Sequence, residues 1–306
     1  MNNPSIKRVI DQAGKIILGK EHQIRLALAC MLARGHLLIE DLPGVGKTTL
    51  AHALAKLLGL NFHRIQFTSD MLPADIIGVS IYDRDTAGFK FHPGPIFAQL
   101  ILADEVNRAT PKTQSALLEA MEEHQVTTEG ETRALPEPFF VIATQNPSTQ
   151  VGTFALPESQ LDRFLLRIEL GYPDRAAERA LLQGVERRDL IASIEPCLHP
   201  GDLVQLQNAV KHVHASPALI DYIQALIEHT RRSPDYTSGL SPRAALALLH
   251  GARAWALIEG RDKVLPEDVQ AILPGVAGHR LRPANDGVSH SSADIARVLI
   301  AAVPIP

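Results

Sequence analysis

The sequence has few aromatic residues and no excess of positive charge. Aromatic side chains make up 5% of the 306 residues, there is one Trp, and the formal net charge is -4. Grooves for single-stranded nucleic acid usually combine basic side chains with stacking rings, and DNA-binding domains usually carry a basic surface. The composition therefore argues against a nucleic-acid partner, and we expect no DNA binding.

Cysteines and long apolar runs are also scarce. Cys30 and Cys197 form no CxxC or metal-ligand spacing, so we expect two buried thiols in a reducing compartment. The apolar stretch 26–33 is far too short to span a bilayer, and residues 1–8 lack the apolar core of a signal peptide. We therefore expect a cytoplasmic protein without a membrane span.

What is present is the composition and patterning of a globular α/β protein. Hydrophobic residues make up 45% of the chain and charged residues 21%, an ordinary balance for a packed core. Up to about residue 172, apolar strand-like runs alternate with helical segments, which is typical of a parallel sheet between helices. The five predicted strands are 36–40, 62–67, 100–104, 139–144 and 164–170. Ligands collect beyond the carboxyl ends of such strands, so polar residues there point to one shared site.

Two segments interrupt this alternation. Residues 78–95 are rich in Gly, Pro and Asp, and in residues 125–138 the pair Glu129-Gly130 lies between short β-prone arms, which predicts a β-hairpin. After residue 172 the strand signal disappears and helical runs follow. We therefore expect an α/β core over residues 1–172 and an all-helical domain over residues 173–306. The predicted helical runs are 175–189, 216–232 and 241–259.

A phosphate-binding loop follows the first predicted strand. Residues 41–48 read Asp-Leu-Pro-Gly-Val-Gly-Lys-Thr and lead into a helical run, which is a Walker A pattern with Asp41 in place of its first Gly. Glycines let backbone N–H groups turn toward phosphate oxygens, Lys47 reaches the terminal phosphates, and Thr48 can bind Mg²⁺. The residues expected to hold ATP are Pro43, Gly44, Val45, Gly46, Lys47, Thr48 and Thr49.

The third and fourth predicted strands end at further candidate residues. The third runs into Asp104 and Glu105, which suits a Mg²⁺ ligand followed by a carboxylate that orients the attacking water. The expected metal ligands are therefore Thr48 and Asp104. The fourth strand leads to Asn146, whose amide can bond the γ-phosphate or hold the water, although a turn role before Pro147 is the alternative.

Two arginines are weaker candidates on the residues alone. Arg163 lies just ahead of a buried strand, where an Arg is more often an ion-pair partner. Arg243 follows Ser241-Pro242 in the first turn of a predicted helix, where a cation is mildly unfavourable. We therefore expect an anion or a partner to compensate Arg243.

Taken in this order, the motifs resemble the AAA+ ATPases, and among them the MoxR family closely. The resemblance covers nearly the whole chain. The matching stretches are GHLLIED at 35–41, LADEVNRA at 102–109, QSALLEAM at 114–121, ATQNP at 143–147, LPE at 156–158 and LDRF at 161–164.

The resemblance implies roles that the residues alone leave open. By that likeness Asn146 is sensor 1, Arg163 is an arginine finger offered to a neighbour's ATP, and Arg243 is sensor 2 in a helical lid. With Glu105 these form the expected catalytic set. Segments 78–95 and 125–138 are similar to the helix-2 and pre-sensor-1 inserts of this AAA+ branch.

The same likeness implies ATP and Mg²⁺ as cofactors and a homo-oligomeric ring, as a hexamer. The family is described as chaperone-like, maturing or activating protein complexes that include metal-dependent enzymes, often beside partners with a von Willebrand A domain. Two alternatives share the ATPase module. A DNA-translocating motor would call for a basic pore and an extra domain, neither of which the sequence shows, and a metal-chelatase motor subunit stays open.

Overall fold

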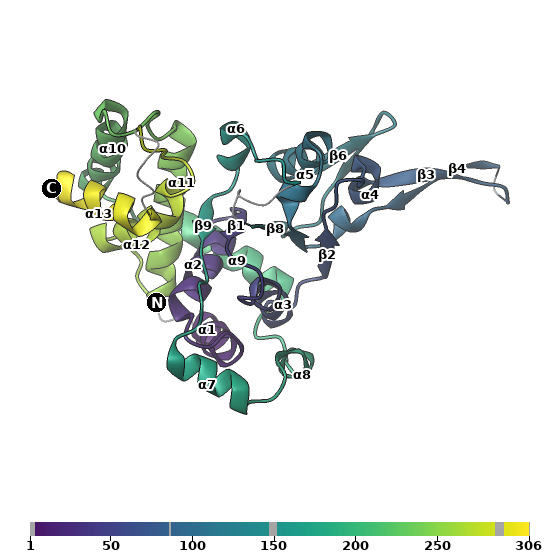
Figure 1. Cartoon of the computed structure of the whole chain (residues 1–306), viewed down its shortest axis with the longest axis horizontal. Coiled ribbons are helices and arrows are strands. Elements are labelled where there is room, and N and C mark those ends of the chain that lie inside the picture. Colours follow the sequence, from purple (N-terminus) through teal and green to yellow (C-terminus); the bar gives the residue numbers. More distant parts are fainter. Residues whose placement is uncertain (1–3, 86, 147–151, 285–290, 306) are drawn as a thin grey trace.

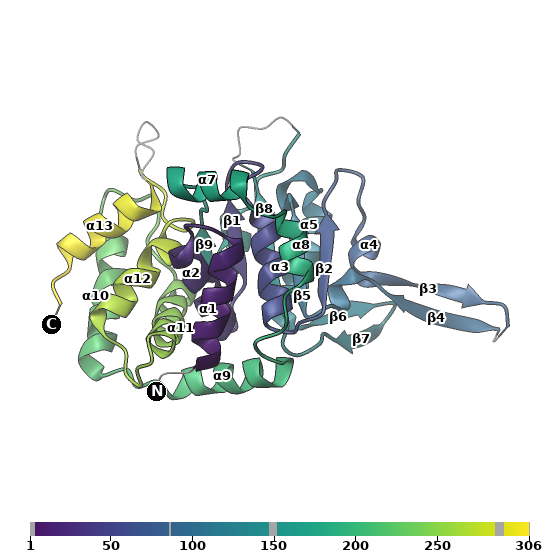
Figure 2. The same cartoon turned by 90° about the horizontal axis from the view of Figure 1, so that it is seen from below.

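The computed structural model describes residues 4–85, 87–146, 152–284 and 291–305 of the chain. Its centre is a five-stranded parallel sheet in the order β2-β5-β8-β1-β9 (Figures 1 and 2). All five predicted strands are confirmed, with ends that differ by at most two residues. Their bounds are β1 Leu37–Glu40, β2 Phe62–Gln66, β5 Leu100–Asp104, β8 Phe140–Gln145 and β9 Leu166–Ile168.

Strand residues alternate between two apolar cores, one on each face of the sheet. Leu100 and Leu102 belong to one core, whereas Ile101 and Ala103 of the same strand belong to the other. Successive side chains of a strand point to opposite faces, so a strand buried on both faces is apolar throughout. The helices around the first core include α1 Pro4–Ile16, α2 Glu21–Leu32 and α3 Lys47–Leu57, and those around the second include α4 Pro73–Ile77 and α5 Pro111–Glu123.

Both interruptions of the alternation form antiparallel hairpins. Strands β6 Gln125–Thr128 and β7 Glu131–Ala134 confirm the predicted hairpin. At its turn Glu129 and Gly130 both have positive φ, 54° and 81°, as a two-residue hairpin of this type requires. Strands β3 Gly78–Asp83 and β4 Gly88–Pro93 form a longer hairpin that projects from the body of the molecule (Figure 2).

The second half of the chain is helical, as expected. The predicted run 175–189 is two helices, α7 Arg175–Gln183 and α8 Arg187–Ala192, because the backbone becomes extended at Gly184. Helix α8 packs on α1 and α3, and α11 packs on α2. The remaining helices are α9 Pro200–His212, α10 Pro217–Arg232, α11 Pro242–Ile258, α12 Pro266–Ala277 and α13 Ser292–Ala302.

The helical bundle of α10 to α13 and the β3–β4 hairpin lie at opposite ends of the molecule, with the sheet between them (Figure 1). Helix α12 contacts β9, the strand at one edge of the sheet. The domain boundary expected at residue 172 stays a prediction. In the described part of the chain no helix is both long enough and apolar enough to cross a bilayer.

Candidate functional site

The loop after β1 has the backbone geometry of a phosphate cradle. Gly44 and Gly46 adopt φ angles of 84° and 97°, which are strained for residues with a side chain, and Gly46 leads directly into α3. Thr48 is exposed in the first turn of this helix. The turned backbone, the helix N-terminus and a free hydroxyl at this place fit the phosphates of ATP with Mg²⁺.

The side chain of Lys47 is held at the carboxyl end of the sheet. Its Nζ donates to the carbonyl oxygen of Asp41 at 2.6 Å and to Oδ1 of Asn146 at 3.1 Å. Burial lowers the pKa of Lys47, and the nearby carboxylates of Asp41, Asp104, Glu105 and Glu40 oppose this shift. The structure therefore keeps a partly desolvated cation where the sequence predicted a phosphate contact.

Asn146 connects this lysine to the predicted water-orienting residue. Its Nδ2 donates to Oε1 of Glu105 at 3.0 Å, so one chain of hydrogen bonds joins Lys47 at the start of α3 to Asn146 after β8 and Glu105 after β5. Asn146 is buried, with 6% of its surface exposed. Pro147, the turn partner in the alternative interpretation, lies outside the described residues. The three residues are brought together as their positions after parallel strands predicted.

Glu105 is held in an unusual conformation by several neighbours. Its backbone lies in the left-handed region, with φ 56°, and its N–H donates to Oγ1 of Thr144 at 2.9 Å. Oε2 accepts from Gln66 Nε2 and from Arg108 NH1, both at 3.0 Å. A non-Gly residue in this region costs of order 1–3 kcal/mol and persists where the surroundings fix it, often at functional sites.

Asp104 is the last residue of β5 and is 7% exposed. Its Oδ1 accepts from the Thr144 hydroxyl at 2.6 Å, and its Oδ2 accepts from Nε and NH2 of Arg64 at 3.0 and 2.6 Å. Both oxygens therefore already have donors. A Mg²⁺ ion would contact this carboxylate through water or after displacing Arg64, which suits an ion that keeps several waters.

Asp41, the departure from the usual loop pattern, points away from the cradle. One carboxylate oxygen accepts from the N–H groups of Leu170 and Gly171, both at 2.6 Å, and the other accepts from Leu42 N–H at 2.7 Å. These donors stabilise the negative charge. Asp41 thus fastens the loop to the chain that leaves β9.

Arg163 and Arg243 do not join this site within the chain. Arg163 Nε lies 3.5 Å from Oε2 of Glu122, and Arg243 bonds the other oxygen of the same carboxylate. The anion expected to compensate Arg243 is therefore Glu122, near the end of α5. The two arginines are 29% and 44% exposed in their side chains, unlike the buried residues around Lys47.

A contact of His36 shows that Glu122 lies near the amino ends of the strands, opposite the cradle. His36 directly precedes β1, and its ring bonds the carbonyl of Met121, the neighbour of Glu122, at 3.1 Å. The cradle follows the other end of β1. Since β1 runs between these points, the two arginines lie near the amino ends of the strands and Lys47 near the carboxyl ends.

Five neighbours of these residues were not predicted from the sequence. Arg64, Gln66, Arg108 and Thr144 bond the acidic pair Asp104 and Glu105, and Glu122 bonds the two arginines. Alternation gave a signal for two of them, because polar residues at 64 and 66 share one side of β2, the neighbour of β5. Arg108 and Glu122 offer no such signal, since each could equally face solvent.

Comparison with known proteins gives the family. Residues 36–166 match the "ATPase family associated with various cellular activities (AAA)", and residues 228–298 match the AAA lid domain. The chain is 44% identical over 306 residues to YeaC of Bacillus subtilis, covering 99% of this chain and 96% of YeaC. It is 41% identical over 288 residues to chaperone MoxR1 of Mycobacterium tuberculosis, covering 90% of this chain and 75% of MoxR1.

The chain belongs to the MoxR family of AAA ATPases. The fold agrees with this. A crystal structure of a candidate ATPase from Cytophaga hutchinsonii superimposes with a TM-score of 0.90 at 38% identity, covering 99% of this chain and 95% of that one. The predicted AAA+ fold with a helical lid and the predicted ATPase activity are therefore confirmed.

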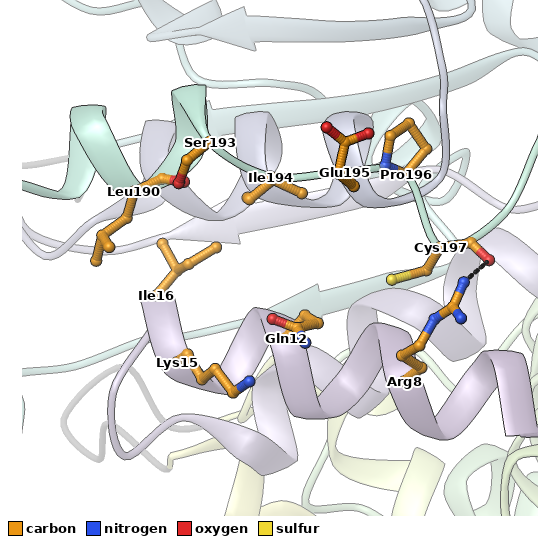
Figure 3. Close-up of a pocket in the computed structure, with 10 residues that line it drawn as sticks. All are labelled: Arg8, Gln12, Lys15, Ile16, Leu190, Ser193, Ile194, Glu195, Pro196 and Cys197. Carbon is orange, nitrogen blue, oxygen red and sulfur yellow. Dashed lines mark hydrogen bonds between the residues drawn. The ribbon is translucent and has the colours of Figure 1, made fainter.

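Another cavity of this MoxR-family ATPase lies away from the cradle, between α1 and segment 193–197 (Figure 3). Its volume is about 410 Å³, and Arg8 in its wall donates to the carbonyl of Cys197 at 3.1 Å.

Of the two cysteines, Cys30 is buried, and burial raises its pKa, but the prediction that Cys197 is also buried was wrong. Cys197 is partly exposed because it lies in a loop that only covers the end of α3, bonding the carbonyl of Leu57.

Proposed function

We propose that this ATPase hydrolyses Mg²⁺-ATP at a site shared between two subunits of a homo-oligomeric ring, a hexamer by family likeness. The carboxyl ends of the strands, with Lys47, Glu105 and Asn146, form what we call the cradle edge, and in one subunit this edge binds the nucleotide and orients water. The amino ends of the strands form the arginine edge, and in the next subunit this edge supplies Arg163, with Arg243 beside it. The cycle drives remodelling, maturation or activation of protein complexes.

Each residue near the cradle has a chemical role in this proposal. Lys47 and the backbone N–H groups of residues 43–48 bind the phosphates, while Thr48 and Asp104 hold Mg²⁺, which neutralises phosphate charge and orients the terminal group. Glu105 accepts a hydrogen bond from the attacking water, and Asn146 donates its amide to the γ-phosphate or that water. Both must then exchange the hydrogen bond they now make to each other.

The observation that supports a shared site is the separation of the two edges. Phosphoryl transfer needs cationic stabilisation of the transition state, and an arginine supplied in trans is a common source. Here the two arginines lie together, half-exposed, near the amino ends of the strands, and the cradle lies near the carboxyl ends. Head-to-tail packing of copies into a closed ring would bring one edge against the other.

Protein complexes are the proposed clients because of the chaperone relative and the charge of the chain. MoxR1 carries the name chaperone, and the net charge of -4 gives no general attraction for nucleic acid. Metal-dependent enzymes and von Willebrand A domain proteins are the proposed kinds of client and partner. A pull-down with Glu105→Gln and ATP would retain the client complex for identification, with Lys47→Ala as the control that does not load ATP.

Mixing two inactive variants tests the shared site. Arg163→Ala lacks the finger, and Glu105→Gln lacks the water-orienting carboxylate, so each alone should be inactive. In mixed rings some interfaces combine an intact Glu105 with an intact Arg163, and turnover should return. Wild-type specific activity should also rise with protein concentration as rings assemble.

The matched control mixes Glu105→Gln with Lys47→Ala. Both changes lie at the cradle edge, so in a mixed ring no interface has a complete cradle edge and turnover should stay absent. If the Arg163→Ala mixture is equally inactive although mixed rings form by native mass spectrometry, catalysis does not use a shared site.

A further inference from the structure

We propose that Arg280 is a positioning residue for the arginine finger, fixing the segment that carries Arg163 to the end of lid helix α12. This rests on the proposed function, in which Arg163 acts on a neighbour's ATP. Arg280 itself touches neither nucleotide nor water in this proposal. It acts through the backbone on both sides of Arg163.

The guanidinium of Arg280 uses all of its five N–H donors within the protein. Nε donates to Oδ1 of Asp162 at 2.6 Å. NH2 donates to the carbonyls of Asp162 at 3.0 Å and Phe164 at 2.7 Å, and NH1 donates to Leu165 at 3.2 Å and to Val276 in α12 at 2.9 Å. Four of the five bonds thus go to residues 162–165, which flank Arg163.

A surface ion pair would not show this arrangement. The Arg280 side chain is 5% exposed, and burial lowers its pKa while the bonded carboxylate of Asp162 opposes the shift. A buried cation is costly unless its donors are matched, and here every donor has an acceptor. The planar fork of Arg presents five donors spread over three nitrogens, whereas the ammonium of Lys has three donors on one nitrogen and cannot replace all five bonds.

The same carboxylate also connects to the helix that carries the second arginine. Ser241 Oγ donates to Oδ2 of Asp162 at 3.0 Å and accepts from Ala244 N–H, capping α11 in whose first turn Arg243 lies. Asp162 is therefore shared by α11 and by Arg280 after α12. A displacement of the lid helices would move Arg163 with them, so the lid position in one subunit would control the finger offered to the next.

Arg280→Lys is the sharpest test, because it keeps the charge and its pairing with Asp162 but loses the fork. Misplacing a catalytic group by about 1 Å can cost about 10²-fold in rate, so we expect kcat to fall about 10²-fold. The Kd for ATP should stay within about twofold of wild type, since the cradle is untouched. Arg297→Lys, an exposed pair with Asp294 in α13, is the matched control and should keep wild-type kcat.

A second readout separates positioning from general damage to the fold. Mixed with Glu105→Gln, Arg280→Lys should regain turnover, because its own cradle edge is intact and the partner supplies a well-placed Arg163. A fault in its own cradle would not be rescued. If Arg163→Ala is rescued by Glu105→Gln and Arg280→Lys is not, the positioning role is overturned while the shared site stands. If neither is rescued, the shared site fails and this inference with it.

Wild-type kcat in Arg280→Lys would also overturn the proposal. Should that variant fail to form rings, Asp162→Asn replaces it. The isosteric amide weakens the bond from Arg280 to the side chain of residue 162 and leaves the bonds from Arg280 to the carbonyls in place. We then expect a smaller fall in kcat, again rescued in trans by Glu105→Gln. Unchanged kcat in Asp162→Asn would contradict the positioning of Arg163 by Arg280.

Discussion

The two edges of the sheet carry the same kinds of side chain in different surroundings. At the cradle edge, Lys47, Asp104 and Asn146 are at most 8% exposed and bonded to one another or to close neighbours. At the arginine edge, Arg163 and Arg243 share Glu122 and stay half-exposed. Buried polar groups need fixed partners, whereas exposed ones can exchange partners at little cost.

Because of this difference, the two edges have different capacities within a single chain. The groups at the cradle edge are held in place within one chain, because they bond each other, and the nucleotide and water would take over some of these bonds. The arginine edge can leave Glu122 for another anion, since an exposed pair is worth only about 0–1 kcal/mol. In the proposed shared site, ATP binding is therefore a property of one subunit, and full catalysis a property of two.

Arg163→Ala, at the partly exposed arginine edge, should have the largest effect. A finger supplied in trans is worth roughly 10³–10⁵ in rate, so kcat should fall by that order while the Kd for ATP is unchanged. Steady-state turnover and fluorescent-nucleotide titration measure the two quantities. A fully active Arg163→Ala would show that Arg163 is only an ion-pair partner of Glu122.

Glu105→Gln, at the cradle edge, should have the next largest effect. The amide keeps the size of the side chain but is a weaker acceptor for the attacking water, so kcat should fall about 10²–10⁴-fold with ATP binding retained. Single-turnover hydrolysis with radiolabelled ATP measures the loss. Turnover near wild type would assign the water to another residue.

His36 tests the fold beneath the arginine edge. Its Nδ1 accepts from the Val141 N–H at 3.0 Å, and burial lowers its pKa to about 4, below the unfolded value of 6.5. The unfolded state therefore binds the proton first. The stabilisation is complete above pH 6.5 and is lost as pH falls toward 4, by on the order of 3 kcal/mol.

Urea unfolding of wild type and His36→Gln between pH 7 and 4.5 measures this contribution. The variant should be less stable at pH 7 and should lose less stability on acidification. Parallel pH curves for wild type and His36→Gln would exclude the assignment to His36.

Arg64→Met should have the smallest effect, and it tests whether Arg64 competes with Mg²⁺ at the cradle edge. Arg64 is 48% exposed and occupies Oδ2 of Asp104, so it competes with Mg²⁺ for that carboxylate. Removing such a pair is worth about 0.2–1 kcal/mol, so the Mg²⁺ concentration for half-maximal turnover should fall up to about fivefold. A higher Mg²⁺ requirement would mean that Arg64 supports the metal site.

Most of the sheet and the cradle could be predicted from the sequence because their signals are local. A strand buried on both faces reads as a continuous apolar run, and glycines at 44 and 46 mark a turn that needs positive φ. The same local view missed the β3–β4 hairpin, whose strands are short of buried apolar residues. It also read one helical run through Gly184, where the chain breaks into two helices.

The sheet, the phosphate cradle and the residues that follow the strands can thus be read from the amino-acid sequence, since each depends on neighbours a few positions away. Which distant groups meet depends on the tertiary fold. Arg243 finds Glu122 across 121 positions, and Arg280 finds Asp162 across 118. A charged side chain carries no local mark of its partner, because the pairing depends on how the lid helices pack against the sheet.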